Sequence, residues 1–140
     1  MNETVCLLPD GGSLRNGVPV FYFQIAALPG GEIVGRCDLR AGHNAETDIG
    51  GNIGYAVFPQ YRGHGYALQA CRLLLEMAAR QGMSRVGICC ERENTASRKT
   101  CERLGAVFCG EITVPEDHTL YAAGKRTLLR YECRLPNNEP

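Results

Sequence analysis

The sequence contains no tryptophan, and aromatic residues make up only 7% of its 140 positions. This scarcity argues against a large stacking pocket for nucleobases or aromatic drugs. A net charge is also lacking, because fifteen basic side chains balance fifteen acidic ones. Without a positive field the chain has no general attraction for DNA, RNA or an anionic membrane. We therefore expect neither nucleic acid nor a membrane as a partner.

Long hydrophobic runs are missing as well. The most apolar stretch, residues 18–29, is interrupted by Gln24 and is shorter than the roughly 18 apolar residues of a membrane-spanning helix. The first four residues, Met-Asn-Glu-Thr, carry an acid where an export signal would carry basic residues. We expect a soluble protein located in the cytoplasm.

Eight cysteines are present, but no Cys-x-x-Cys pair. In a chain without an export signal, we expect reduced thiols rather than a disulfide scaffold. Most of the cysteines stand among Val, Ile and Leu, as buried free cysteines do. The histidines, His43, His64 and His118, have no cysteine pair at short spacing, so we expect no metal site.

The apolar periodicity predicts strands and helices in an order typical of an α+β protein. The expected strands cover residues 4–8, 18–27, 32–40, 52–58, 85–90, 106–114 and 127–135. Helices are expected over residues 67–80 and from the cap Asn94 to about residue 105, and polar loops over residues 41–51 and 115–125. We expect one domain, residues 1–140, with a mixed, mostly antiparallel sheet and helices on its faces.

A glycine-rich turn, Tyr-Arg-Gly-His-Gly-Tyr-Ala at residues 61–67, connects a strand to the longer helix. A helix start leaves main-chain N–H groups unpaired and carries the positive end of the helix dipole, which suits a phosphate or pyrophosphate. Gly63 and Gly65 would let a ligand approach the main chain, and Arg62 would add a charged donor. The glycines alone also fit a plain tight turn. The Rossmann motif would need glycine at Leu68, and the P-loop sequence is absent.

The spacing of Arg62, Gly65 and Ala67 after a strand resembles the cofactor turn of the GNAT superfamily of acetyl-CoA-dependent N-acetyltransferases. A second segment, Asn-Thr-Ala-Ser at residues 94–97 followed by Leu-Gly-Ala at 104–106, is similar to the family's Asn-x-x-Ala/Ser…Gly-Phe segment. The resemblance covers residues 32–114 and includes the expected order of elements.

The resemblance implies a site for acetyl-CoA as co-substrate, without a metal. The turn would hold the pyrophosphate, the preceding strand would pair with the pantetheine arm, and the start of the second helix would contact its far side. The residues at these positions are Arg62, Gly63, His64, Gly65, Tyr66 and Ala67, then Tyr55, Ala56 and Val57, then Asn94 and Ser97. The family resemblance also implies that the strands before and after the first helix splay apart. The acceptor would be a primary amine of a small molecule or peptide, attacking the thioester directly in a ternary complex.

Two departures from the family pattern concern the reaction itself. Family members usually have one or two helices between their first two strands, whereas only residues 11–17 lie there. The acceptor side is therefore either open or completed by a second copy of the chain in a homodimer. Where related enzymes of the ribosomal-protein type have a tyrosine that protonates the departing thiolate, this chain has Cys101. Cys101 could donate that proton, attack the thioester covalently, or simply fill the core.

An ammonium acceptor also requires a general base. Asp38 and Asp48 are the candidates near the expected acceptor side, and either could bind the acceptor's cation instead. His43, His118 and Tyr121 are further candidates, and all five also fit solvated loop residues. The alternative function is a CoA-binding module without acetyltransferase activity.

Overall fold

Between residues 4 and 135, the part that this computed structural model describes, the chain forms strands β1 to β7, helices α1 to α4 and the 3-10 helix η1. In chain order these are β1 (Val5–Arg15), β2 (Val18–Ala27), β3 (Ile33–Arg40), α1 (Ala45–Gly50), β4 (Ile53–Val57), η1 (Pro59–Tyr61), α2 (Tyr66–Arg80), β5 (Arg85–Cys90), α3 (Thr95–Arg103), β6 (Val107–Thr113), α4 (Thr119–Ala122) and β7 (Thr127–Arg134). Residues 1–3, on which the expectation about an export signal partly rests, lie outside the described residues.

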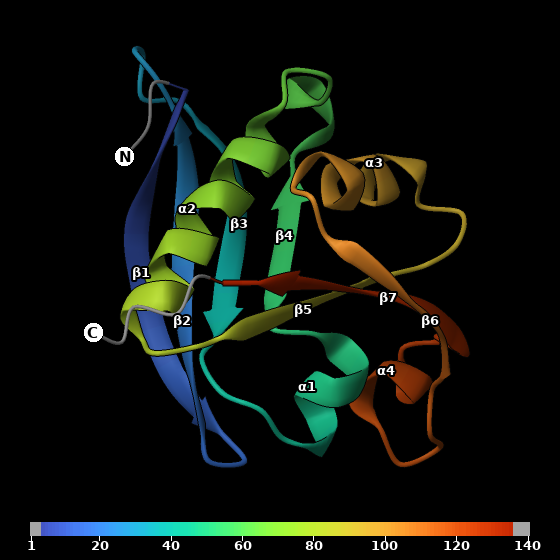
Figure 1. Cartoon of the computed structure of the whole chain (residues 1–140). Helices are drawn as coiled ribbons and strands as arrows, with labels where there is room; N and C mark the ends of the chain where they lie inside the picture. Colours follow the sequence, from blue (N-terminus) through green and yellow to red (C-terminus); the bar gives the residue numbers. More distant parts are fainter. Residues whose placement is uncertain (1–3, 136–140) are drawn as a thin grey trace.

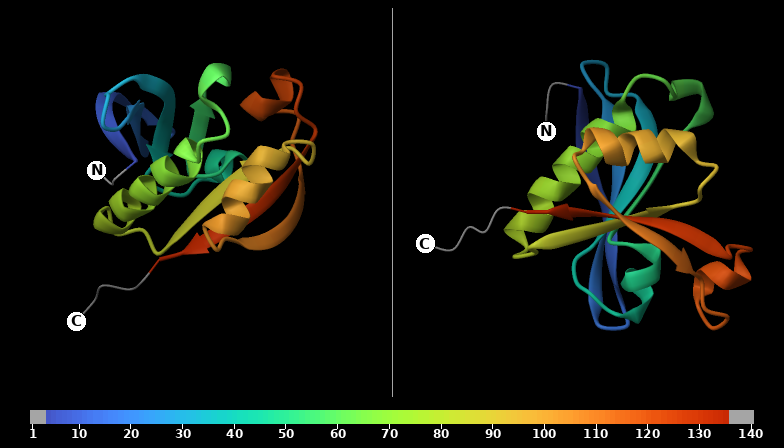
Figure 2. Two further views of the ribbon diagram at one scale, coloured as in Figure 1. Left: turned by 90° about the horizontal axis from the view of Figure 1, so that it is seen from above. Right: turned by 45° about the vertical axis from the view of Figure 1, so that its right-hand side comes forward.

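The strands form two antiparallel ladders, β1-β2-β3-β4 and β5-β7-β6 (Figure 1). Strands β4 and β5 follow each other around α2, yet they do not pair as a ladder. A single bridge joins Gly51 to Ile88, and beyond it the two ladders cross at a wide angle in every view (Figures 1 and 2). The predicted α+β class and the splayed central strands are confirmed. The edge of β4 that faces β5 is left without a strand partner.

A buried asparagine holds the vertex where the two ladders meet. The side chain of Asn52 is fully buried. Its amide nitrogen donates to the main-chain carbonyls of Arg40 at 3.0 Å and Gly42 at 2.8 Å, and its Oδ1 accepts from the N–H of Gly87 at 2.8 Å. The main-chain N–H of Asn52 donates to the carbonyl of Gly87 at 2.7 Å. One residue thus ties the end of β3 to β5 and fixes where the strands separate.

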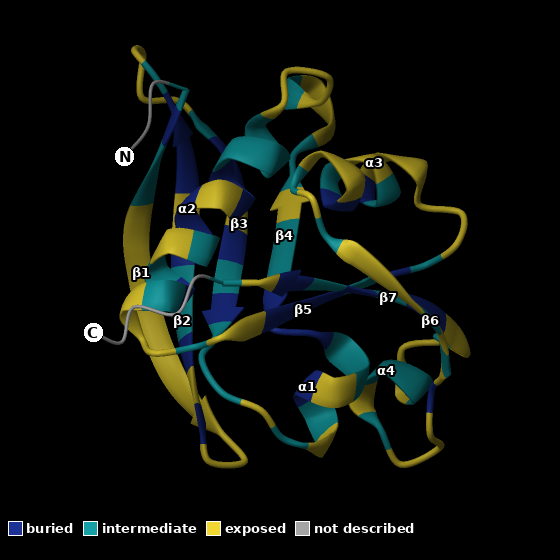
Figure 3. Cartoon of the chain, viewed as in Figure 1, coloured by how far each residue is buried: buried dark blue, intermediate teal, exposed yellow. Residues whose placement is uncertain are grey.

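Helix α2 packs across one face of the first ladder. It buries Ala70, Cys71, Leu73, Leu74 and Ala78, which lie on one side of the helix. Figure 3 shows the dark blue of buried residues concentrated in β2, β3 and β5. This packing holds the N-terminus of α2 at the open end of β4. No helix among the described residues is both long and apolar enough to span a membrane.

The first strand is longer than the pattern predicts. It continues from Val5 to Arg15 and turns directly into β2, whereas only residues 4–8 were expected. Pro9, Gly11 and Gly12 resemble strand breakers, but a bulge between Pro9 and Gly12 accommodates them. Such residues are tolerated on an edge strand, where one side needs no partner. The resulting hairpin leaves no room for a helix between β1 and β2.

Two segments expected to be loops contain short helices, which is a correction. Asn44 caps α1, because its side chain accepts from the N–H of Thr47 at 2.8 Å while Thr47 Oγ1 accepts from the N–H of Asn44 at 2.9 Å. His118 caps α4, because its Nδ1 accepts from the N–H of Leu120 at 3.0 Å. These helices are too short to show an apolar period, and of their two caps only Asn44 is a residue type that commonly starts a helix.

Candidate active site

A cavity of about 340 Å³ opens where β4 and β5 separate. Tyr55, Asn94 and Ser97 line it on the side expected to receive the cofactor. On the other side it is lined by α1, α4 and the end of the β1-β2 hairpin. Segments of this chain thus line the side where the sequence predicted the acceptor. A small ligand fits a cavity of this size.

The glycine-rich turn leads into α2 with its donors exposed. Among the described residues, no acceptor is bonded to the main-chain N–H groups of residues 63–68, whereas the N–H of Gln69 donates to the carbonyl of Gly65 at 3.1 Å. Gly63 and Gly65 have φ of 88° and 75°, and a Cβ at either position would meet nothing within 4 Å. The turn is therefore an open row of donors at the positive end of a helix, as anion binding requires.

Arg62 is the charged side chain of this turn. Its Nε donates to the carbonyl of Val57 at 3.3 Å, which holds the exposed guanidinium beside the end of β4. Its main-chain N–H is already engaged with the carbonyl of Pro59 at 3.4 Å. Arg62 can therefore contribute its side chain to an anion, whereas the main-chain donors come from the residues after it.

Tyr55 and Ser97 meet across the cavity. Their hydroxyl groups share a hydrogen bond that joins β4 to α3. Asn94 caps α3, with its Oδ1 accepting from the N–H of Ser97 at 3.1 Å, and its amide nitrogen has no partner among the described residues. Burial raises the pKa of Tyr55 well above its usual value, so the phenol stays protonated at neutral pH.

Cys101 lies in the core instead of the cavity wall. Its side chain is 0% exposed and packs in the central hydrophobic cluster. Burial raises the pKa of the thiol to about 12, with neighbouring cysteines adding to the shift. A protonated thiol enclosed by apolar side chains is a weak nucleophile.

Asp38 and Arg40 form an ion pair on the face of the first ladder opposite α2. Arg40 Nε lies 2.9 Å from Asp38 Oδ2, and Arg40 Nη1 donates to the carbonyls of Gly50 and Gly51, each at 3.1 Å. Burial raises the pKa of Asp38, and the Arg40 guanidinium opposes that shift in part. A Cβ on Gly54 would lie 2.6 Å from Asp38 Oδ1 and 2.7 Å from Arg40 Nη2. The pair thus occupies the space that a glycine in β4 leaves open.

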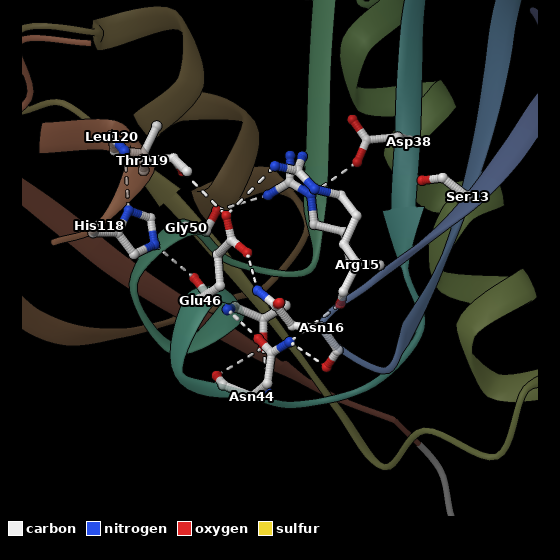
Figure 4. A network of polar contacts seen from close by, with 12 residues as sticks. Ser13, Arg15, Asn16, Asp38, Asn44, Glu46, Gly50, His118, Thr119 and Leu120 are labelled. Atoms are coloured by element: carbon white, nitrogen blue, oxygen red, sulfur yellow. Dashed lines mark hydrogen bonds and ion pairs between the residues drawn. The ribbon is translucent and has the colours of Figure 1, made fainter. Parts of the chain in front are cut away.

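Glu46 is a candidate that sequence reasoning missed. Its Oε1 accepts from Thr119 Oγ1 at 3.1 Å and lies 3.5 Å from Arg15 Nη2, while its Oε2 accepts from Asn16 Nδ2 at 3.0 Å. Figure 4 shows this carboxylate between the β1-β2 hairpin and α4. Glu46, Arg15 and Thr119 all line the cavity. The only signal in the sequence was Asn44, which marks the start of the helix that carries Glu46.

The other candidate bases do not gather at one point. Asp48 and His43 are exposed and lie outside the cavity lining. The partial desolvation of the His43 ring, together with the nearby charge of Arg85, lowers its pKa. His118 lines the cavity, but Nε2 of its ring bonds to the carbonyl of Glu46 at 3.0 Å. Tyr121 lies under the guanidinium of Arg126, 3.5 Å from the ring centroid. Of this set, the structure brings only His118 into the cavity wall.

All eight cysteines are free thiols, as expected from the sequence. Within residues 4–135, no three side chains of His, Cys, Asp or Glu gather in a way that could hold a metal ion.

Comparison with known proteins gives a consistent family. Residues 12–107 match the family model described as an acetyltransferase (GNAT) domain. The uncharacterized N-acetyltransferase YjdG of Bacillus subtilis (strain 168) is 37% identical over 57 residues, which are 40% of this chain and 34% of that protein. The chain therefore spans about a third of the length of this relative.

Two solved structures share the fold at 21% sequence identity and a TM-score of 0.64. One is the microcin C7 self immunity acetyltransferase MccE in complex with acetyl-CoA and AMP, and the match covers 83% of this chain and 61% of that one. The other is the Salmonella typhimurium acetyl transferase that modifies the N-terminal serine of the 50S ribosomal subunit protein L7/L12, with 84% of this chain and 64% of that one covered. The chain spans less than two thirds of either.

Proposed function

The chain belongs to the GNAT acetyltransferase family, and from this premise we propose that it is an acyltransferase that moves an acetyl group from acetyl-CoA to a primary amine. The observation that carries the proposal is the row of unpartnered N–H groups at residues 63–68, which follow the end of β4, together with the cavity that Gly54 and Tyr55 of the same strand line where β4 and β5 separate. Acetyl-CoA as the donor is supported by its presence in the MccE complex. An amine acceptor is supported by the N-terminal serine that the Salmonella protein modifies.

In this proposal the cofactor lies along the fork. Its pyrophosphate accepts from the main-chain N–H groups of Gly63, His64, Gly65, Tyr66 and Ala67, with the guanidinium of Arg62 as an additional charged donor. The pantetheine arm pairs with the open edge of β4 at Tyr55, Ala56 and Val57, as an added strand would. Asn94 offers its unpartnered amide nitrogen from the opposite side. The thioester then reaches the cavity next to Tyr55 and Ser97.

The transfer itself needs two proton movements. The amine nitrogen attacks the thioester carbon, the C–S bond breaks, and the sulfur takes the electron pair and a proton. Tyr55 is the proposed donor of that proton, because its hydroxyl lies at the cavity and stays protonated. The amine's proton passes to a carboxylate on the acceptor side, for which Asp38 and Glu46 are the candidates. Neither Asp38 nor Asp48 lines the cavity. Asp38 is kept because it contacts Arg40, which does, whereas Asp48 is exposed and is assigned no role here.

Tyr55→Phe should lower kcat by about a hundredfold, the usual contribution of a positioned acid, while acetyl-CoA affinity stays the same. Because burial raises the pKa of Tyr55, the wild-type rate should show no loss from ionisation of this group below about pH 10. Steady-state kinetics across pH together with calorimetric binding measure both effects. A variant with wild-type kcat would exclude Tyr55 as the donor.

Cys101→Ala should leave acetyl transfer intact and lower the free energy of unfolding by about 1 kcal/mol, because a small buried group is lost from the core. Intact-mass measurement of the wild-type protein after mixing with acetyl-CoA should show no acetyl group on the enzyme. An acetylated Cys101 in that measurement would establish the covalent route instead.

A broad amine screen with detection of released CoA thiol tests the function as a whole. Turnover on any acceptor excludes an inert CoA-binding module, whereas tight acetyl-CoA binding without turnover would favour it. A single domain over residues 1–140, a homodimer and a cytoplasmic location stay predictions. Sedimentation of the purified chain tests the homodimer.

A further inference from the structure

Two arginines share one wall of the cavity. In the ladder register Arg15 pairs with Val18, and Val20 pairs with Arg40, so all four side chains project from the same face of the sheet. The two valines are 5% and 3% exposed, and all four residues line the cavity. The side chains of Arg15 and Arg40 therefore lie on either side of an apolar surface formed by Val18 and Val20.

Both guanidinium groups retain donors that nothing satisfies within the described part of the chain. Arg40 uses Nε on Asp38 and Nη1 on two carbonyls, but Nη2 has no acceptor. That nitrogen lies over Gly54 of β4, only 2.7 Å from where a Cβ would be. Arg15 makes one ion pair, at 3.5 Å with Glu46, and its other nitrogens have no partner. A guanidinium carries five N–H groups, so most of those on Arg15 are available to a ligand.

The charges around these donors are balanced, which favours a ligand with both signs. Asp38 and Glu46 accompany Arg15 and Arg40, so the cluster carries two groups of each sign. A carboxylate matches the planar fork of an arginine, and an ammonium matches the carboxylates. Gly54 and Tyr55 face opposite sides of β4 but both line the cavity, so a carboxylate held at Arg40 Nη2 would share the cavity with the proposed reaction centre. An amine on the carbon beside that carboxylate would keep both charged groups of the ligand within this cluster.

We propose that the acceptor is a free amino acid, or another small amine with a carboxylate on the carbon beside it, and that Arg15 and Arg40 bind this carboxylate. A protein N-terminus carries a neutral peptide bond at that position, so the remaining donors of the two guanidinium groups would receive no carboxylate. The identification of this ligand as the acceptor rests on the acetyl transfer proposed above. The carboxylate site can nevertheless be tested without turnover.

The binding experiment uses the product form, in which the amine carries no charge. The twenty N-acetyl-L-amino acids and their carboxamides are titrated by calorimetry into the protein loaded with CoA. At least one acid should bind about tenfold or more tightly than its amide, because a charge-assisted bond is lost in the amide. Arg15→Gln should remove that preference, and Arg15→Lys should restore part of it. Arg36→Gln serves as the control, since Arg36 is exposed on β3 outside the cavity lining.

Turnover of free amino acids and their amides separates the two proposals. Acids preferred over amides in both assays, with dependence on Arg15, support both. Arg15-dependent binding of acids without turnover of any amine would overturn the acetyl transfer and leave the carboxylate site standing. Equal binding of acids and amides, or a preference unchanged in Arg15→Gln, would overturn the carboxylate site even if other amines are acetylated.

Discussion

Replacement of Gly65 by leucine is expected to abolish acetyl-CoA binding while the far-ultraviolet circular dichroism spectrum stays that of the wild type. Gly65 has φ of 75° at the start of α2, and nothing lies within 4 Å of a Cβ there, so a leucine side chain would take up open space among the residues whose N–H groups are unpartnered. The affinity should fall about a hundredfold or more, because several hydrogen bonds to a charged group, each about 1.5–3 kcal/mol, are lost together. Isothermal titration with acetyl-CoA measures the loss.

The chain offers a matched control at the other end of the same helix. Gly82 has φ of 84° and also has nothing within 4 Å of a Cβ, so Gly82→Leu carries the same backbone penalty of about 1–2 kcal/mol. That variant should bind acetyl-CoA as the wild type does. If Gly65→Leu binds equally well, the turn is not the pyrophosphate site and the proposed function loses its main support.

Asn52→Leu should lower the free energy of unfolding by about 3–5 kcal/mol. Leucine is similar in size, but it leaves the Gly87 N–H and the carbonyls of Arg40 and Gly42 without their partner. Each buried main-chain group left unsatisfied costs about 1–3 kcal/mol. Urea unfolding followed by circular dichroism measures the difference.

The control for this variant is Gln24→Leu, which replaces an exposed amide on β2 and should change stability by less than about 0.5 kcal/mol. A loss below about 1 kcal/mol for Asn52→Leu would mean that the vertex between the ladders does not depend on the asparagine. The position of the fork would then have to come from packing of the strands alone.

The elements on the cofactor side of the cavity were predicted correctly from the sequence. Strands at 18–27 and 85–90 and the cap Asn94 were predicted as the structure has them. The turn at residues 61–67 was predicted to present unpaired N–H groups, and those of residues 63–67 have no partner among the described residues. Glycines, caps and apolar periods act over a few consecutive residues, so a single sequence carries them.

The elements on the acceptor side of the cavity were not predicted correctly from the sequence. Residues 41–51 and 115–125 were predicted as loops, and the first strand was predicted to end at residue 8, well before Arg15. Glu46 then had no visible partner, because its contacts come from the β1-β2 hairpin and from α4, which are distant in the sequence. Long-range contacts of this kind leave no local pattern.

The order of the strands and of the two longer helices, the family and the donor-rich start of α2 were properties of the sequence alone, because hydrogen-bonding demand and apolar period belong to neighbouring residues. Tertiary structure decided which side chains share the cavity. It enclosed Cys101 in the core, brought the hydroxyl of Tyr55 to Ser97 and set Arg15 beside Arg40. Strand register and the packing of remote elements decide which side chains face each other, and a shift of one residue would turn each to the opposite face.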